Sequence, residues 1–285
     1  MPSATAPIRV LCLHGLGTGS NILKSQLSPV LSLLPSSYSF VFLDGPVICD
    51  PSPGVAELYD GPYRCWFNTP TNDKVAQAYK HMQKFLDDNV DRPFDVVIGF
   101  SQGAALVAGM LLREQLGRTG RNETAPTLFK AAMFICSPLP FSCTSDYGVD
   151  VRRYFGIEPS LKSLPSNRPT TVPDYLVADA FFLRNDKDLA GVANGFEDKK
   201  DYKVEAEPYY NMLHPDVDTT RISIPTAHVY GKEDSWRRHS MDLVRLCEGA
   251  NRICFQHDGG HEIPRAASEE ICDLFEELIA RAGLF

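Results

Sequence analysis

Residues 95–106 read DVVIGFSQGAAL and join an apolar run to a run rich in Ala and Leu. Between the two runs, GFSQG (residues 99–103) matches the pattern G-x-S-x-G, in which a serine lies on a sharp turn from a strand to a helix. Small residues must flank that serine because the turn brings the two backbones close together. The segment therefore predicts a strand over 94–100, a helix over 101–116 and an exposed hydroxyl at Ser101.

Strand and helix patterns alternate on both sides of this segment. Apolar runs predict strands at 8–13, 38–43, 94–100, 128–136, 226–230 and 253–256, and helical spacing predicts helices at 20–34, 72–89, 101–116, 235–247 and 264–281. Repeated strand–helix units with continuous apolar strands are typical of a parallel sheet covered by helices on both faces. The predicted fold class is α/β, in the form of an α/β-hydrolase fold with a mostly parallel central sheet and an inserted cap.

The cap is predicted where the alternation stops. Residues 137–224 are rich in Pro, Tyr, Phe and charged side chains, and include a possible short helix at 208–213. Because long connections inside a compact domain usually serve as lids or are disordered, we expect a core of residues 1–136 and 225–285 with a cap over 137–224. The Pro- and Gly-rich stretch 47–70 is predicted to be a loop.

Charge and cysteine content exclude several classes of protein. The 285 residues carry a formal net charge of -8 without a Lys/Arg cluster, so nucleic-acid binding is not expected. None of the eight cysteines forms a C-x-x-C pair, which gives no support to a zinc or thioredoxin-type site. The N-terminus lacks the features of a secretory signal and no stretch is apolar enough to span a bilayer, so we expect reduced cysteines and a cytoplasmic location. The oligomeric state is not determined by the sequence.

A base and an acid are needed beside Ser101, because a serine hydroxyl is a poor nucleophile until its proton is accepted. His261 is the predicted base, since it lies in GGHEIP (residues 259–264) between the last predicted strand and the last helix. In this fold the acid falls between the serine and the histidine in chain order. Asp234 is the predicted acid, because it follows the strand over 226–230 and a glycine turn.

Each of these three residues has an alternative interpretation. Ser101 and Asp234 are also suited to capping the helices that follow them, a role that a catalytic aspartate can combine with its own. Glu233 is the nearest rival acid, whereas Asp216, Asp218 and the acids near Asp198 lie in the predicted cap. The other histidines considered are interpreted as structural or as badly placed for catalysis, namely His14, His81, His214, His239 and His257.

Two backbone N–H groups are expected to stabilise the negative charge that develops on a substrate carbonyl oxygen. One is that of Gln102, the residue after the nucleophile, and the other is that of Leu16, in the loop over 14–19. The same loop has a loose likeness to the dinucleotide pattern G-x-G-x-x-G, but Ser20 stands where the last glycine is required. Nucleotide binding is therefore not predicted.

Aromatic residues predict an apolar binding surface for an acyl chain. The candidates in the 47–70 loop and the cap are Tyr63, Trp66, Phe67, Phe181, Phe182, Tyr209 and Tyr210. The alternative is that many of these side chains only pack the cap onto the core.

Taken together, several segments resemble the fungal serine hydrolase (FSH) family. The matching segments are VLCLHG (10–15), FLDGP (42–46), VIGFSQG (97–103), HVYG (228–231) and GGHEIP (259–264). The resemblance implies a triad of Ser101, Asp234 and His261 in an esterase or thioesterase. Some family members act beside fungal polyketide synthases, and the stretch over 17–27 is similar to that branch. The predicted cap is longer than in compact members of the family.

The predicted reaction is hydrolysis of an acyl thioester or ester through an acyl-serine, releasing a polyketide or fatty acyl chain from a carrier protein. It requires neither a metal nor an organic cofactor. The alternatives are a carboxylesterase for small molecules, an acyltransferase or cyclase with the same triad, and a binding protein on an inactive hydrolase fold. The sequence does not identify the acyl chain or the carrier.

Overall fold

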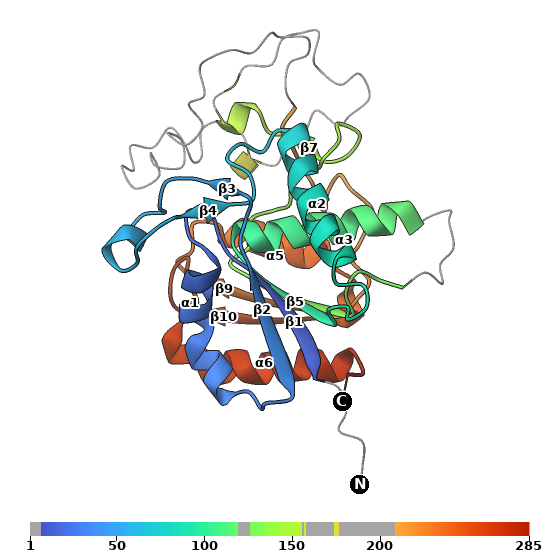
Figure 1. The fold of residues 1–285 in the computed structure, drawn as a ribbon. Helices are drawn as coiled ribbons and strands as arrows, with labels where there is room; N and C mark the ends of the chain where they lie inside the picture. Colours follow the sequence, from blue (N-terminus) through green and yellow to red (C-terminus); the bar gives the residue numbers. More distant parts are fainter. Residues whose placement is uncertain (1–6, 119–125, 156, 158–173, 177–208, 285) are drawn as a thin grey trace.

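The computed structural model describes residues 7–118, 126–155, 157, 174–176 and 209–284. Its centre is a six-stranded sheet in the order β10-β9-β6-β5-β1-β2, and every neighbouring pair of strands is parallel (Figure 1). The strands are β1 (Ile8–Leu13), β2 (Tyr38–Leu43), β5 (Val96–Phe100), β6 (Ala131–Ile135), β9 (Thr226–Gly231) and β10 (Arg252–His257). The predicted α/β class and parallel sheet are confirmed.

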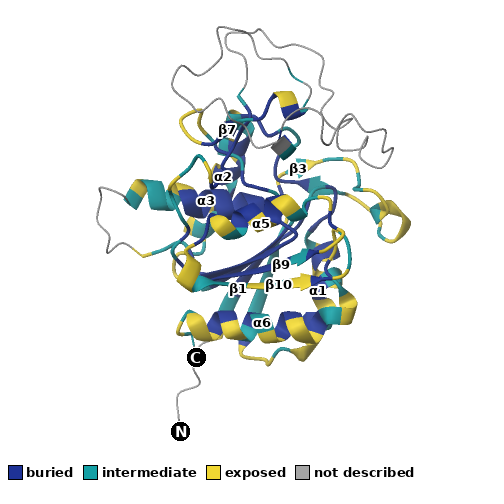
Figure 2. Ribbon diagram, turned by 180° about the vertical axis from the view of Figure 1, so that it is seen from behind, coloured by how far each residue is buried: buried dark blue, intermediate teal, exposed yellow. Residues whose placement is uncertain are grey.

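Helices cover both faces of the sheet. Those described are α1 (Ser20–Leu33), α2 (Asn72–Asp87), α3 (Gln102–Arg118), α5 (Arg237–Arg245) and α6 (Ser268–Arg281). Figures 1 and 2 show α1 and α6 on one face and α2, α3 and α5 on the other. Consecutive strand residues alternate between the two layers: Leu11 and Val97 pack with α2 and α3, whereas Val10 and Val96 pack with α1 and α6.

Parallel pairing brings the carboxyl ends of the strands to one edge of the sheet. Leu13 at the end of β1 is in register with Leu43 of β2 and with Gly99 near the end of β5. His257 at the end of β10 is likewise opposite Gly231 at the end of β9. The loops that follow these strands therefore meet at this edge, which is where parallel α/β sheets place their ligands.

The segments that connect the main strands and helices contain short strands and 3₁₀ turns. The 47–70 loop contains the two-residue strands β3 (Val47–Ile48) and β4 (Arg64–Cys65), which pair with each other, and the 3₁₀ turn η1 (Val55–Glu57). The remaining described 3₁₀ turns are η2 (Arg153–Phe155), η4 (Asp174–Leu176), η5 (Gly249–Asn251) and η6 (Arg265–Ala267). The last helix thus begins with η6, and α6 itself starts at Ser268 rather than at Pro264.

Residues 209–213 of the helix predicted at 208–213 are described, and the prediction is wrong for them. Asn211–Met212 forms strand β8, which pairs antiparallel with β7 (Val149–Asp150). The carbonyls of Tyr210 and Asn211 accept hydrogen bonds from the N–H groups of Val151 and Ser142. Both carbonyls are therefore bonded to neighbouring segments of the chain and not to N–H groups of a helix.

Only part of the predicted cap is described, so its division from the core stays a prediction. Its described residues Leu139, Val149 and Leu213 are buried in the same cluster as the side chains of α2 and α3. All eight cysteines are free thiols, and five of them are buried. Among the described residues, no helix combines the length and the hydropathy needed to cross a bilayer.

Phe275 provides a test of the layer formed by α1 and α6. Its ring is 1 % exposed and lies 5.4 Å from that of Tyr38 on β2. We expect Phe275→Ala to lower the free energy of unfolding by about 3–5 kcal/mol, because it removes buried apolar surface and leaves a cavity. Urea denaturation measures the change, and Leu58→Ala, at a side chain that is 78 % exposed, is the control. Equal losses in the two variants would contradict this packing.

Candidate active site

Ser101 lies on the turn between β5 and α3 with a φ of 50°, in the left-handed region that side chains rarely adopt. Its N–H donates to the carbonyl of Ile135 at 2.9 Å, and its carbonyl accepts from the N–H of Ala105 at 3.0 Å. A Cβ at Gly99 would lie 2.4 Å from Ala104, and one at Gly103 would lie 2.5 Å from the carbonyl oxygen of Leu13. Glycine at both positions is therefore a steric requirement of the turn.

The side chains of Ser101, His261 and Asp234 form a continuous hydrogen-bonded chain. The Ser101 Oγ and the His261 Nε2 are 2.8 Å apart. The His261 Nδ1 lies 3.0 and 3.1 Å from the two carboxylate oxygens of Asp234. Since an ionised carboxylate only accepts, Nδ1 carries the hydrogen and Nε2 of the neutral ring is free to accept one from Ser101.

Two adjacent loops carry the histidine and the aspartate. The N–H groups of Lys232 and Glu233 donate to the carbonyls of His257 and Gly259 at 2.8 and 3.1 Å. A Cβ at Gly231 would lie 2.2 Å from the carbonyl oxygen of Gly260, so the close contact of the loops depends on this glycine. The pairing of β9 with β10 is thus continued beyond the sheet into the site.

Asp234 also starts the turn that leads into α5. One carboxylate oxygen accepts the N–H of Trp236 at 2.8 Å, which closes this turn. The N-cap position of α5 is Trp236 and has no side-chain cap hydrogen bond, so the interpretation of Asp234 as the cap of this helix is wrong. Burial would raise the pKa of Asp234, but the hydrogen bond and charge of His261, with the Trp236 N–H, outweigh it and lower that pKa. The carboxylate is therefore ionised at neutral pH.

The rival residues differ from Asp234 and His261 in their exposure or in their partners. Glu233 is exposed, whereas His239 is buried within α5, where burial lowers its pKa to about 3. The ring of His257 is buried, and its Nδ1 accepts the N–H of Gly259 at 3.1 Å. His81 lies on α2, and Asp198 falls outside the described residues.

His214, Asp216 and Asp218 belong to a polar cluster that joins η4 to α5. The buried His214 contacts the hydroxyl of Tyr175 at 3.1 Å and the carboxylate of Asp242 at 3.3 Å. Burial would raise the pKa of Asp242, but hydrogen bonds from His214, Tyr175 and Arg245 lower it to about 2. Asp216 pairs with Arg245, and Asp218 accepts the N–H groups of Gly148 and His214. These contacts tie the segment over 214–218 to η4, to α5 and to Gly148.

The loop over 14–19 is held against Ser101 by a fully buried histidine. The Nε2 of His14 accepts the N–H of Gly45 at 2.8 Å, so Nδ1 carries the hydrogen and donates to the carbonyl of Gly15 at 2.7 Å. The hydroxyl of Thr18 donates to the same carbonyl at 2.8 Å. Because a trans peptide points its C=O and N–H in opposite directions, these bonds also fix the direction of the Leu16 N–H.

The side chain of Gln102 connects the turn at Ser101 to the 47–70 loop. Its Oε1 accepts the N–H of Trp66 at 2.9 Å, and its Nε2 donates to the carbonyl of Phe67 at 2.7 Å. The indole of Trp66 in turn donates to the carbonyl of His14 at 2.8 Å. The sequence analysis considered only the backbone of Gln102, and the choice of a carboxamide inside G-x-S-x-G is the signal that could have revealed this connection.

The residues predicted to bind substrate differ in exposure. Trp66 and Phe67 are buried, whereas Tyr63 and Tyr209 are half-buried. The hydroxyl of Tyr63 donates to the carbonyl of Tyr59, and the ring of Tyr209 lies under the guanidinium of Arg152. Tyr210 is buried, and Phe181 and Phe182 lie outside the described residues. Their binding role stays a prediction.

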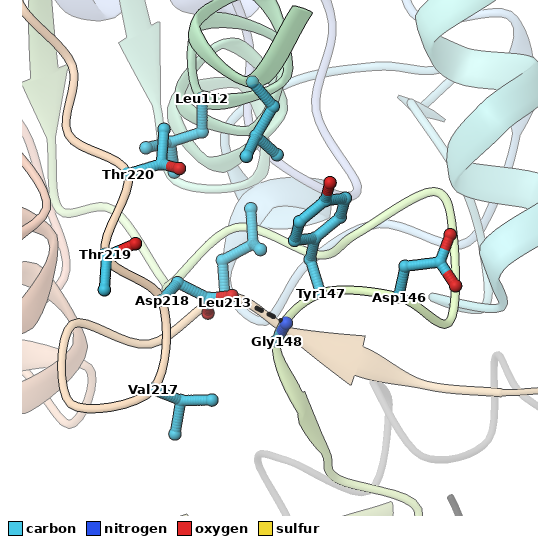
Figure 3. A pocket seen from close by; sticks show the side chains of 10 residues that line it. Leu112, Asp146, Tyr147, Gly148, Leu213, Val217, Asp218, Thr219 and Thr220 are labelled. Carbon is cyan, nitrogen blue, oxygen red and sulfur yellow. Dashed lines mark hydrogen bonds between the residues drawn. The ribbon is translucent and has the colours of Figure 1, made fainter. Parts of the chain in front are cut away.

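A separate cavity of about 290 Å³ lies between α3 and the segments around residues 147 and 217 (Figure 3). Tyr147, Leu213 and Thr220 are among its lining residues, and the carboxylate of Asp218 accepts the N–H of Gly148 beside it. A second cavity of about 280 Å³ shares Tyr147 and Leu213. Neither Ser101 nor His261 lines these cavities.

Several known proteins are similar to this chain in sequence. The family model described as serine hydrolase (FSH1) matches residues 3–271. A probable esterase tazC of Aspergillus terreus is 36% identical over 99% of this chain and 94% of its own length. Esterase FUS5 of Gibberella fujikuroi is 35% identical, covering 93% of this chain and 84% of its own length.

Solved structures show the same fold at low sequence identity. The acyl-protein thioesterase 2 of Zea mays superposes with a TM-score of 0.51 at 16% identity, covering 98% of this chain and 96% of its own. The monoacylglycerol lipase of Paleococcus ferrophilus gives 0.52 at 15% identity, covering 97% and 96%. Both are α/β proteins of the predicted class.

The lowered pKa of Asp234 predicts a pH-dependent contribution to stability. The ionised carboxylate stabilises the native state above the unfolded-state pKa of about 3.9, and this contribution is lost as pH falls through the lower folded-state pKa. We expect Asp234→Asn to reduce the free energy of unfolding at pH 7 by about 1.5–3 kcal/mol, with the deficit shrinking at more acidic pH. Urea denaturation at several pH values measures it.

The exposed neighbour supplies the control for this experiment. Glu233→Gln removes a carboxylate from an exposed position in the same turn and is expected to change stability little at any pH. A deficit in Asp234→Asn that stays constant from pH 7 to the acid range would show that the charge of Asp234 is not what stabilises the fold.

Proposed function

Because the chain belongs to the serine hydrolase (FSH1) family, we propose that Ser101, His261 and Asp234 are the catalytic triad with which it cleaves acyl esters or thioesters. The observation that carries this assignment is the 2.8 Å contact of the Ser101 Oγ with a histidine Nε2 whose other nitrogen faces a buried carboxylate. This arrangement lets the ring accept the serine proton at the moment of attack.

The reaction proceeds in two steps. As Ser101 attacks the substrate carbonyl, His261 takes the hydroxyl proton and then gives it to the departing thiol or alcohol, leaving an acyl-serine. His261 next accepts a proton from water, whose oxygen attacks the acyl-serine, and returns that proton to Ser101 as the acid is released. Asp234 keeps the imidazole in the required tautomer and stabilises its charged form.

The backbone N–H groups of Leu16 and Gln102 are the proposed oxyanion donors. Support comes from the close approach of the first loop, since a Cβ at Gly15 would lie 3.2 Å from the Cβ of Ser101. The hydrogen bonds of His14 and Thr18 to the Gly15 carbonyl fix the peptide that carries the Leu16 N–H. Donors that are already oriented need no rearrangement when charge develops.

The proposed substrate is a polyketide or fatty acyl thioester presented by an acyl carrier protein. Support comes from the resemblance of residues 17–27 to the polyketide-releasing branch. We propose residues 137–224 as the cap over this site, with Tyr63, Phe67 and Tyr209 toward the acyl chain, and a cytoplasmic location in which the thiols stay reduced.

A carboxylesterase for small molecules is the second candidate, favoured by the names of relatives, which are called esterases. Matched pairs of substrates that share one acyl chain, presented as a phosphopantetheine thioester and as an oxygen ester, distinguish the two. A higher kcat/KM for thioesters supports release from a carrier, and the reverse supports the esterase. Mass analysis of the product shows whether water or a hydroxyl group of the substrate accepts the acyl chain.

Ser101→Ala is expected to lower kcat by about four orders of magnitude or more on every substrate that the wild type cleaves. The covalent step needs the hydroxyl, so no acyl-enzyme forms. Release of thiol or alcohol measures the rate, and Ser28→Ala, at an exposed position on α1, controls for loss of a serine. Unchanged turnover in Ser101→Ala would refute the triad.

His14 tests the orientation of the oxyanion donor. In His14→Asn the side-chain amide can still donate to the Gly15 carbonyl, whereas in His14→Gln it reaches the Nε2 position and can bond only Gly45. We expect Gln to lower kcat more than Asn, by up to about 10²-fold, with little change in KM, because the Leu16 N–H loses its orientation.

Thermal unfolding of both His14 variants monitors folding separately from catalysis. Equal kcat values for two equally stable variants would mean that the bond of His14 to the Gly15 carbonyl has no part in the reaction.

A further inference from the structure

Cys136 lies directly behind the Asp234–His261 pair, at the end of β6. Its backbone has a φ of 48°, and its N–H donates to the carbonyl of Val229 at 2.8 Å. The side chain has no exposed surface, and its Sγ donates to the carbonyl of Glu262, the residue after His261, at 3.4 Å. The fold therefore holds a thiol beside the proposed base and acid, although the reaction does not use it.

The ligand atoms of these three side chains lie close enough to share one ion. The Cys136 Sγ, a carboxylate oxygen of Asp234 and a ring nitrogen of His261 all lie within 4.8 Å of one another. A thiolate, an imidazole and a carboxylate are the donors that zinc takes in proteins, and three of them leave one tetrahedral position open. The thiolate selects soft cations, whereas Mg²⁺ and Ca²⁺ prefer sets of oxygen ligands.

We propose that Cys136, Asp234 and His261 form an inhibitory site for a thiophilic divalent cation, Zn²⁺ or Cd²⁺. Only the inhibition rests on the proposed function, since the binding itself requires no catalysis. The Nδ1 of His261, which faces Asp234, is the nitrogen that ligates. A cation reaches the site past the ring of His261, whose side chain is 30% exposed, whereas that of Asp234 is fully buried.

Binding of the cation prevents His261 from acting as a base, because it changes the tautomer of the imidazole. The thiol proton of Cys136 passes to solvent as the metal–sulfur bond forms, and the Nδ1 proton is replaced by the metal. The neutral imidazole must then carry its hydrogen on Nε2, so one proton is released in total. In that state Nε2 can only donate toward the Ser101 Oγ, and the serine has no base to accept its proton.

Cadmium is the probe, because each cadmium–thiolate bond adds an ultraviolet charge-transfer absorbance. Titrations use the 285-residue chain carrying Ser101→Ala, alone or with Cys136→Ser or Cys254→Ser. The last replaces the exposed cysteine on β10 and is the matched control. We expect Cys136→Ser to weaken cadmium binding at least about tenfold and to remove one thiolate's absorbance, with no such loss of affinity in the control.

The assignment of His261 as a ligand has its own variant. His261→Ala, combined with Ser101→Ala, keeps the thiol and is also expected to weaken cadmium binding at least about tenfold. Cadmium binding that is the same with and without Cys136→Ser, or the same with and without His261→Ala, would overturn the site.

Inhibition is tested on the wild type with a fluorophosphonate that labels Ser101. We expect Cd²⁺ and Zn²⁺ to slow labelling at least about tenfold and a chelator to restore it, whereas Mg²⁺ has no effect. Cys136→Ser, compared with its own metal-free rate, is expected to resist both cations. Cadmium binding through Cys136 without slower labelling would refute the inhibition. Binding by Cys136 in a chain that never labels would retain the site and reject the proposed function.

Discussion

The left-handed turn at Ser101 is the constraint on which the rest of the site depends. A non-glycine residue is held at a φ of 50° by hydrogen bonds to β6 and α3, and glycines on both sides let β1, β5 and α3 approach one another. Such a conformation persists only when the surrounding structure determines it. The fully buried strands β5 and β6 and the buried residues 103–112 of α3 supply that rigidity, so the strain directs the hydroxyl toward the loops of the neighbouring strands.

Hydrogen bonds between polar groups connect the loops that surround Ser101. Gln102 joins the serine turn to Trp66 and Phe67, and Trp66 bonds to the loop of His14. On the other side, backbone bonds connect the loop of Asp234 to that of His261. A buried polar network of this kind rigidifies a site when each member is satisfied. The serine is consequently held between two preformed units.

The sequence predicted those features of the structure that leave a regular pattern or a motif in the chain. Long apolar runs and helical spacing predicted the six parallel strands and the main helices. The motif around Ser101, with His261 after two glycines and Asp234 after a glycine turn, pointed to the residues that meet at the sheet edge. Short elements were missed, because two paired residues such as Asn211–Met212 leave no periodic signal. The roles of the His14 ring, the Gln102 amide and the Cys136 thiol were also missed, since they depend on contacts between segments far apart in the chain.

The proposed base follows an edge strand, and this position affects how the active site is lost when the protein begins to unfold. His261 follows β10, which lies at the edge of the sheet and, among the described strands, pairs only with β9, whereas the strand before Ser101 has partners on both sides. Most residues of β10 keep some contact with solvent. Edge elements open more readily than central ones. Fraying that begins at β10 would therefore separate the imidazole from the hydroxyl while the centre of the sheet stays intact, so the local stability of this margin sets the temperature range in which the three side chains remain assembled.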